Sequence, residues 1–201
     1  MRKGMLASAA LAVLALGTMF SGPAASASEQ QIAPKVVSST ITISQIATRG
    51  PAGQNDQYIE LHNISAQPVS LSNWSVKACL AGTQVVTELT FPAGTMLQPQ
   101  GQISSYLLLV NPTGYSRAVG EDADFFITIP DSGGVMLANQ FGSKIDSVGF
   151  SSNACASRTP AVPQNANLDQ ASLRVQNTGV NQQDFVLYGP STFQRNQSSV
   201  G

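Results

Sequence analysis

The feature that most constrains this chain is a succession of short apolar stretches, separated by turns rich in glycine, proline and asparagine. In most of these stretches apolar residues share one parity and polar residues the other, as in half-buried β-strands. From residue 28 onward, no segment shows a sustained apolar period of about 3.6 residues, the pattern of an amphipathic helix. The sequence therefore predicts an all-β sandwich or barrel rather than an α/β enzyme.

The expected strands number about nine or ten, as in a β-sandwich. They cover residues 37–44, 57–63, 74–80, 85–91, 103–110, 125–129, 135–138, 145–150, 172–175 and 185–188. Ile46 breaks the preceding alternation and predicts a β-bulge. Residues 107–110 are apolar on both parities, so both faces of that strand are expected to be covered. Residues 131–134 have the composition of a tight hairpin connection between two strands.

The first residues have the pattern of an export signal. Arg2 and Lys3 precede an apolar stretch over residues 6–20, and Ala25-Ser26-Ala27 offers a small-residue cleavage site. As a membrane anchor, this stretch is shorter than the ~20 apolar residues that a spanning helix needs. We therefore expect residues 1–27 to be a cleavable signal peptide of bacterial type. The product is expected in the periplasm, in the cell envelope or outside the cell, without a membrane span.

Cleavage leaves enough chain for one domain of ordinary size. Residues 28–38 are polar, lack periodicity and are expected to form a flexible leader. Residues 39–197 are expected to form the β-sandwich domain. The full chain has 10 basic and 11 acidic residues. Because the basic residues are few and scattered, we do not expect binding to nucleic acid through phosphates.

The two cysteines, Cys79 and Cys155, have one possible pairing. An even number of cysteines in an exported chain favours a disulfide over free thiols. A zinc site needs more ligands than two distant cysteines and one histidine, so the sequence argues against that alternative.

Two neighbouring stretches, Ile59-Glu60-Leu61-His62-Asn63 and residues 69–76, resemble the lamin tail domain family. Further similarity to this family and to the tails of its bacterial members lies in residues 91–101, 172–174, 184–185 and 190–196. His62, Asn73 and Phe193 depart from the family pattern, and these departures bear on local turn shapes.

The resemblance implies an immunoglobulin-like β-sandwich in an exported, single-domain bacterial member with an interaction role. Fold alone does not define function. Trp74, which lies in an expected strand and in the family pattern, is expected in or near the core. Glu60, Arg174 and Asp184 are expected to have structural roles.

Glu60 is the acidic residue of most interest, because it lies within an apolar strand. Alternation places Glu60 and His62 on one side of that strand, and Ile59 and Leu61 on the other. The pair could act as an acid and a base. We favour a structural contact between Glu60 and a basic residue such as Arg174, because such neighbours on a strand are common and no motif places a nucleophile.

Other candidates for chemistry are few. His62 is the only histidine, which argues against most hydrolase designs and multi-histidine metal centres. Glu121, Asp122 and Asp124 could offer oxygens to calcium, but they lack the alternating acidic loop and the closing glutamate of a calcium motif. We expect a solvated acidic turn. No catalytic, cofactor-binding or metal-binding residue is assigned.

The sequence thus predicts a non-enzymatic module that binds a protein or envelope partner through its loops or an open sheet edge. Two alternatives stay open. One is an accessory to a metal-dependent hydrolase or nuclease, or a cryptic one, and the other is a purely structural envelope component. The sequence predicts neither the identity of the partner nor the oligomeric state.

Overall fold

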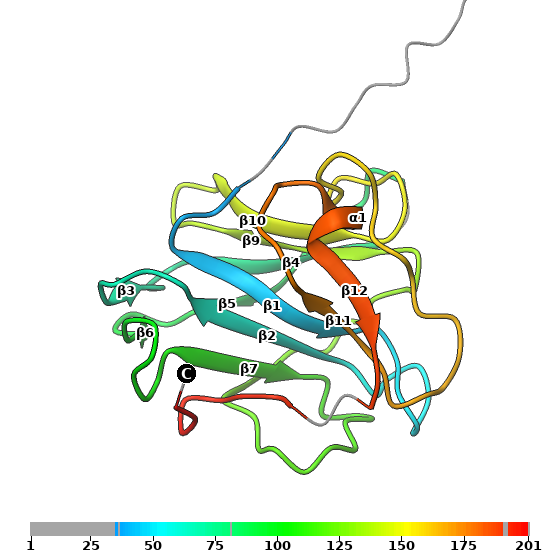
Figure 1. Cartoon of the computed structure of the whole chain (residues 1–201), viewed down its shortest axis with the longest axis horizontal. Coiled ribbons are helices and arrows are strands. Elements are labelled where there is room, and N and C mark those ends of the chain that lie inside the picture. Colours follow the sequence, from blue (N-terminus) through cyan, green and yellow to red (C-terminus); the bar gives the residue numbers. More distant parts are fainter. Residues whose placement is uncertain (1–34, 36, 81, 191–192, 201) are drawn as a thin grey trace, which may run out of the picture. The chain divides into compact units, whose positions relative to one another are not determined.

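The apolar stretches form the strands of two sheets in a sandwich-like arrangement (Figure 1). The structure is a computed structural model that describes residues 35, 37–80, 82–190 and 193–200. These residues belong to one compact unit, residues 32–201. The expected signal peptide, residues 1–27, lies outside the described residues.

The larger sheet has six strands in the order β12-β11-β1-β2-β7-β8. They are β12 (Phe185–Tyr188), β11 (Ala171–Arg174), β1 (Ile41–Ala47), β2 (Tyr58–Asn63), β7 (Tyr106–Val110) and β8 (Ala123–Asp124). The second sheet has the order β10-β9-β4-β5, with β10 (Lys144–Gly149), β9 (Gly134–Ala138), β4 (Ser75–Cys79) and β5 (Val85–Thr90). Two short strands, β3 (Val69–Ser70) and β6 (Met96–Leu97), pair separately, and α1 (Asn181–Asp184) precedes β12.

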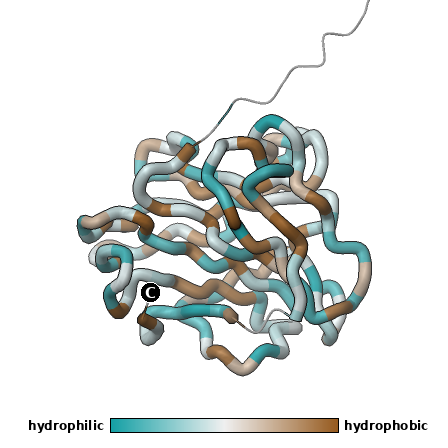
Figure 2. Tube along the Cα trace, viewed as in Figure 1, coloured by the Kyte–Doolittle hydropathy of each residue, from teal (hydrophilic) through white to brown (hydrophobic). Residues whose placement is uncertain are grey.

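The core contains apolar side chains from both sheets. Ile43, Ile59 and Leu109 of the larger sheet belong to the same buried cluster as Val76 and Leu137 of the smaller one. Burial of each such side chain contributes roughly 1.5 to 3 kcal/mol. Figure 2 shows apolar residues along the strands and hydrophilic residues in many of the loops. The predicted all-β sandwich is confirmed.

The alternation that breaks at Ile46 does reflect a β-bulge, and the structure places its extra residue at Ser44. Ile43 pairs with Leu61 and Gln45 pairs with Glu60, so the register shifts between them. The shift lets Ile43 and Ile46 both face the core although their parities differ. Ser44 is thereby brought to the side chain of Glu60.

Strand β7 is covered on both faces, as its apolar sequence predicts. Leu107 and Leu109 belong to the core between the sheets, whereas Leu108 and Val110 belong to a second cluster with Tyr58. We call the side of the larger sheet that carries this second cluster the outer face. Tyr115 and Val119 pack against it.

The expectation of a strand over residues 125–129 is wrong. The strand in this region is β8, which pairs in parallel with β7. Side chains replace a neighbouring strand as partners here, because the N–H groups of Ile127 and Ile129 donate to the side chains of Glu88 and Gln57. The expectation of a hairpin at residues 131–134 is also wrong, since they lead from the larger sheet into β9 of the smaller one.

One departure from the family pattern has a clear structural role. Asn73, where glycine is common, has a φ of 61°. Asparagine adopts this left-handed conformation more readily than most residues other than glycine. The tight turn before Trp74 is therefore kept without a glycine.

No helix in the described ranges of the chain is long and apolar enough to cross a membrane.

Candidate functional site

The outer face carries a cluster of polar and aromatic side chains, which we call the outer-face cluster: Ser44, Tyr58, Glu60, His62 and Tyr106. Alternation along β2 places three of them there, because Ile59 and Leu61 face the core. Tyr106 on β7 pairs with His62, and the bulge in β1 contributes Ser44. Glu60 and Tyr58 have no exposed surface, so the cluster is a buried polar layer.

The carboxylate of Glu60 lies between β1 and the chain's C-terminal residues. The Ser44 hydroxyl donates to its Oε1 at 2.6 Å, and the backbone N–H of Arg195 donates to its Oε2 at 2.6 Å. The Arg195 guanidinium lies 3.7 Å from Oε1. Burial raises the pKa of Glu60 to about 7, against the lowering effects of Ser44 and Arg195. The expected pairing of Glu60 with Arg174 is wrong, because the basic partner is Arg195.

His62 forms an aromatic contact rather than an acid–base pair. Its ring stacks on that of Tyr106, with the centroids 4.0 Å apart and the planes 9° from parallel. Burial, together with the positive charge of Arg195, lowers the pKa of His62 to about 4. The imidazole is therefore neutral near pH 7 and packs as an aromatic ring.

The outer face is closed by residues 193–200, which we call the C-terminal strap. In Figure 1 this red segment runs beside β7. The guanidinium of Arg195 lies over the Tyr106 ring, 4.1 Å from its centre, and donates to the Tyr106 hydroxyl at 2.6 Å. Gln194, which is nearly buried, donates to the Tyr58 hydroxyl at 3.2 Å.

Arg174 pairs with two aspartates rather than with Glu60. Its guanidinium lies 2.6 Å from Asp146 on β10 and 3.3 Å from Asp184 in α1. Its Nε donates to the carbonyl of Ile43, while the N–H of Ile43 donates to Asp146 at 2.7 Å. The three side chains are nearly fully buried. They fasten the bulge of β1 to the edge strand of the other sheet.

Asp184 also organises the loop before β12. Its Oδ1 accepts hydrogen bonds from the N–H and the hydroxyl of Thr178, at 2.6 and 2.7 Å, and its Oδ2 accepts from the N–H of Gly179 at 2.9 Å. These hydrogen bonds hold the loop at residues 178–179 against α1.

Glu121 and Asp122 are exposed, as expected of a solvated turn, but Asp122 also has a structural contact that the sequence does not predict. One carboxylate oxygen of Asp122 accepts the N–H of Leu108 at 2.8 Å and that of Gln197 at 3.0 Å. Burial is the main cause that raises the pKa of Asp122. Within the described residues, no three His, Cys, Asp or Glu side chains form a group that could hold a metal ion, and this includes Glu121 and Asp124.

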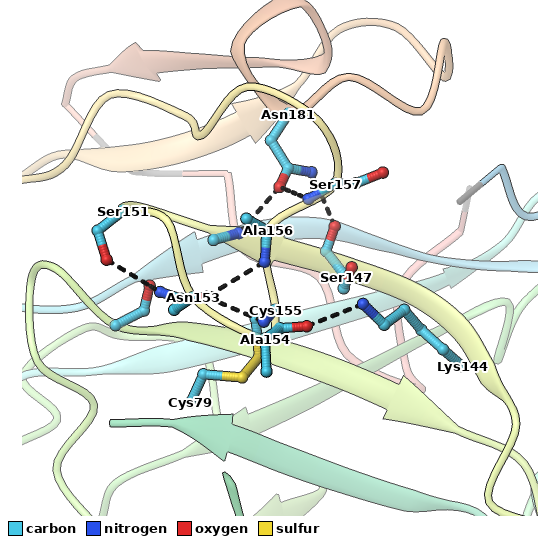
Figure 3. The surroundings of a disulfide bond; sticks show 12 residues. Cys79, Lys144, Ser147, Ser151, Asn153, Ala154, Cys155, Ala156, Ser157 and Asn181 are labelled. Atoms are coloured by element: carbon cyan, nitrogen blue, oxygen red, sulfur yellow. Dashed lines mark hydrogen bonds between the residues drawn. A yellow bond between two sulfur atoms is a disulfide. The ribbon is translucent and has the colours of Figure 1, made fainter. Parts of the chain in front are cut away.

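Trp74 is partly buried and packs against the core, which agrees with a near-core position. The predicted disulfide joins Cys79 of β4 to Cys155, with a Cα–Cα distance of 5.9 Å (Figure 3). The side chain of Asn153 accepts the N–H groups of Cys155 and Ala156. The disulfide and this turn hold the loop after β10 against the smaller sheet.

A shallow open depression of about 370 Å³ lies beside the strap. Its lining includes Pro51, Val119, Asp169 and Gln194. It also includes Arg117, whose guanidinium forms a buried ion pair with Asp56 and lies over the Tyr58 ring. This ion pair supports the outer-face cluster from the side opposite Tyr106.

Two sheets around one core define an immunoglobulin-like, all-β sandwich domain. The model of the lamin tail domain family matches residues 35–152. The chain belongs to the lamin tail domain family. No curated protein matches it at a significant level. The family match ends before β11, α1 and β12, which contribute Arg174 and Asp184.

Sequence reasoning missed Arg195, Tyr106 and Asp146. Asp146 had a usable signal, because a charged residue inside an apolar strand needs a partner. Tyr106 could have been found as the neighbour of His62 once β2 was paired with β7. Arg195 lies in the stretch 190–196 that resembles the tails of bacterial family members, but that resemblance gives no partner for its side chain.

We expect Glu60→Gln to remove a pH dependence of stability. The pKa of Glu60 is about 7 in the folded protein and 4.5 ordinarily. Between these values the folded state holds a proton that the unfolded chain releases, so the free energy of unfolding falls as the pH rises. The loss for Glu60 is on the order of 3 kcal/mol once the pH passes about 7. Urea denaturation across this pH range measures it.

His62→Phe provides a control of opposite sign. The pKa of His62 falls from 6.5 to about 4 on folding, so the wild type loses stability as the pH falls through this window. The phenylalanine variant should lose less. Burial also raises the pKa of Glu88 to about 7. Glu88 is present in the wild type and in both variants, so its contribution to the pH dependence of stability cancels when they are compared. Parallel pH profiles for the wild type and Glu60→Gln would contradict the expectation.

Proposed function

We propose that this lamin tail domain protein is an exported, non-catalytic module that binds a protein partner in the cell envelope or outside the cell. The observation that carries the proposal is an exposed apolar patch at one edge of the larger sheet. Val186, Tyr188 and Phe193 form this surface, which we call the β12 patch.

The β12 patch combines exposed apolar side chains with an open strand. The exposed fractions are 41% for Val186, 47% for Tyr188 and 62% for Phe193. Val186 pairs with Leu173, and Tyr188 and Phe193 line a small depression together with Leu173. Among the described strands, β12 is the last in its sheet. Apolar side chains beside an open edge are typical of a site for protein partners.

The state of the titratable side chains supports a non-catalytic role. Glu60 is held by Ser44 and Arg195, His62 stacks on Tyr106, and Asp122 accepts two backbone N–H groups. Each of these contacts holds the fold, and the perturbed pKa values of Glu60, His62 and Asp122 have burial as their main cause.

A capture experiment tests the proposal. The mature chain is used as bait against envelope and secreted fractions of the producing cells, beside the double variant Val186→Ser/Tyr188→Ser. The control is Phe141→Ser, which changes another exposed aromatic residue, in the loop between β9 and β10 of the smaller sheet. We expect a partner that the wild type and the control retain and the double variant loses.

Two results would overturn the proposal. One is capture that does not depend on the β12 patch. The other is a hydrolase or nuclease activity of the purified chain that requires a divalent metal and disappears in Glu60→Gln while the variant stays folded.

The proposed export can be tested separately, at the cleavage site of the signal peptide. The positive start, the apolar stretch and the small residues before Ser28 predict cleavage after Ala27. We expect mass spectrometry of secreted material to find a chain that begins at Ser28. Replacing Ala25 and Ala27 with bulky residues should block processing. A mature chain that still begins at Met1 would refute export through a cleaved signal.

A further inference from the structure

The C-terminal strap contacts the outer face in the way a bound peptide contacts a receptor. Side chains mediate the contacts of five consecutive residues, 193–197. At the start of the strap, the side chain of Gln45 donates to the carbonyl of Phe193 at 3.0 Å, and the side chain of Gln194 donates to the Tyr58 hydroxyl at 3.2 Å. In its middle, the N–H of Arg195 donates to Glu60 at 2.6 Å, and the side chain of Asn196 donates to the carbonyl of Gly120 at 2.9 Å. At Gln197, the N–H donates to Asp122 at 3.0 Å and the carbonyl accepts from the Ser104 hydroxyl at 3.0 Å. These contacts involve the backbone of Phe193, Arg195 and Gln197, and the side chains of Gln194, Arg195 and Asn196.

Arg195 makes the most selective of these contacts. Its guanidinium lies over the Tyr106 ring, bonds to the Tyr106 hydroxyl and lies 3.7 Å from the Glu60 carboxylate. A planar cation that stacks on an aromatic ring and bonds at its edge is a requirement that arginine meets and lysine does not. The position of Arg195 is thus specific for a guanidinium group.

The groups that meet Gln194 and Arg195, namely Tyr58, Glu60 and Tyr106, are on strands of the sheet and have contacts within it. Glu60 is oriented by the hydroxyl of Ser44 on β1, and Tyr106 by its stacking on His62 of β2. Tyr58 donates its hydroxyl to Gln45 of β1 at 3.0 Å. Each contact joins neighbouring strands of one sheet, so the groups that meet the strap are positioned in advance.

We propose that the outer-face cluster is a binding site for a peptide segment that carries the dipeptide Gln-Arg, and that the strap occupies this site as a displaceable internal ligand. The inference rests on the proposed function, because the ligand is a segment of the partner protein. Phe193 belongs to both the strap and the β12 patch, so a partner at the patch is next to the site. An internal ligand competes at an effective concentration of about a millimolar, so binding to the intact chain is weak until the strap leaves.

The test uses the full chain with a protease recognition sequence in place of residues 191–192. The chain is folded, cut there, and titrated into a fluorescent peptide of residues 193–201, with fluorescence anisotropy as the readout. We expect the cut chain to bind the peptide at least about tenfold more tightly than the uncut chain. A peptide with Arg195→Ala should bind at least about tenfold more weakly. The control peptide carries Val200→Ala, at an exposed position, and should bind like the original.

Three results would overturn the inference: a cut chain that unfolds, a cut chain that does not bind the peptide, or equal binding of the peptide with Arg195→Ala. Adding excess peptide to the partner-capture experiment distinguishes failure of this inference from failure of the proposed function. A partner whose capture needs Tyr188 but is unaffected by excess peptide would leave the proposed function standing and remove the peptide site. Capture that the peptide reduces, and that the peptide with Arg195→Ala does not reduce, supports both.

Discussion

Arg174→Ala should lower the free energy of unfolding by about 3 to 5 kcal/mol, because it leaves two buried carboxylates without their cation. The side chains of Asp146 and Asp184 are 2% and 1% exposed. The variant also loses the bond from Nε to the carbonyl of Ile43 and the contact with the Phe185 ring. Urea denaturation measures the change, with Lys35→Ala as a control that removes an exposed cation.

The control should change stability by less than about 0.5 kcal/mol. A second variant distinguishes charge from packing. Arg174→Met/Asp146→Asn removes an opposite pair of charges and keeps much of the volume, so it should be more stable than Arg174→Ala. An effect of Arg174→Ala no larger than that of Lys35→Ala would contradict the role assigned to this ion pair.

Loss of the disulfide should have a comparable effect. Cys79 and Cys155 are 76 residues apart, and a loop of that length corresponds to roughly 4 to 5 kcal/mol in the chain-entropy model. Cys79→Ala/Cys155→Ala should therefore lower the melting temperature by on the order of 10 °C. Alanine suits both positions, because they have no exposed surface.

Scanning calorimetry with and without a reducing agent checks this expectation. Reductant present during unfolding should lower the melting temperature of the wild type toward that of the double variant. The double variant itself should not respond. If the wild type and the double variant unfold at the same temperature without reductant, the disulfide does not stabilise the domain.

The two arginines that meet buried carboxylates differ in what they contribute. Arg174 lies 2.6 Å from Asp146 and its side chain is 8% exposed, whereas Arg195 lies 3.7 Å from Glu60 and is 37% exposed. Solvent screens the second pair much more than the first. The pKa of Glu60 remains about 7 despite Arg195. These differences are consistent with a structural role for Arg174 and an exchangeable one for Arg195.

Local patterns in the sequence predicted much of the fold. The alternation in residues 57–63 and 74–80 predicted β2 and β4, and the unbroken apolar run at residues 107–110 predicted a strand covered on both faces. The break at Ile46 predicted the bulge in β1. Side chains alternate between the faces of a strand as a matter of backbone geometry, so these properties need no knowledge of distant residues. Residues 125–129 look like a strand by the same rule and are not one, because the N–H groups of Ile127 and Ile129 donate to side chains instead of to a neighbouring strand.

The sequence by itself determined which side chains share a face, including Glu60 and His62, and it determined the one cysteine pair that could form. Only the tertiary structure decided which acid meets which base. The sequence favours Arg174, which lies in an expected strand, as the partner of Glu60, although the partner in the structure is Arg195. The bulge of β1 brings Arg174 to Asp146, and the strap brings Arg195 to Glu60. Charge pairing depends on distance and burial in space, and residues 135 positions apart, such as Glu60 and Arg195, meet only after the sheet and the strap are in place.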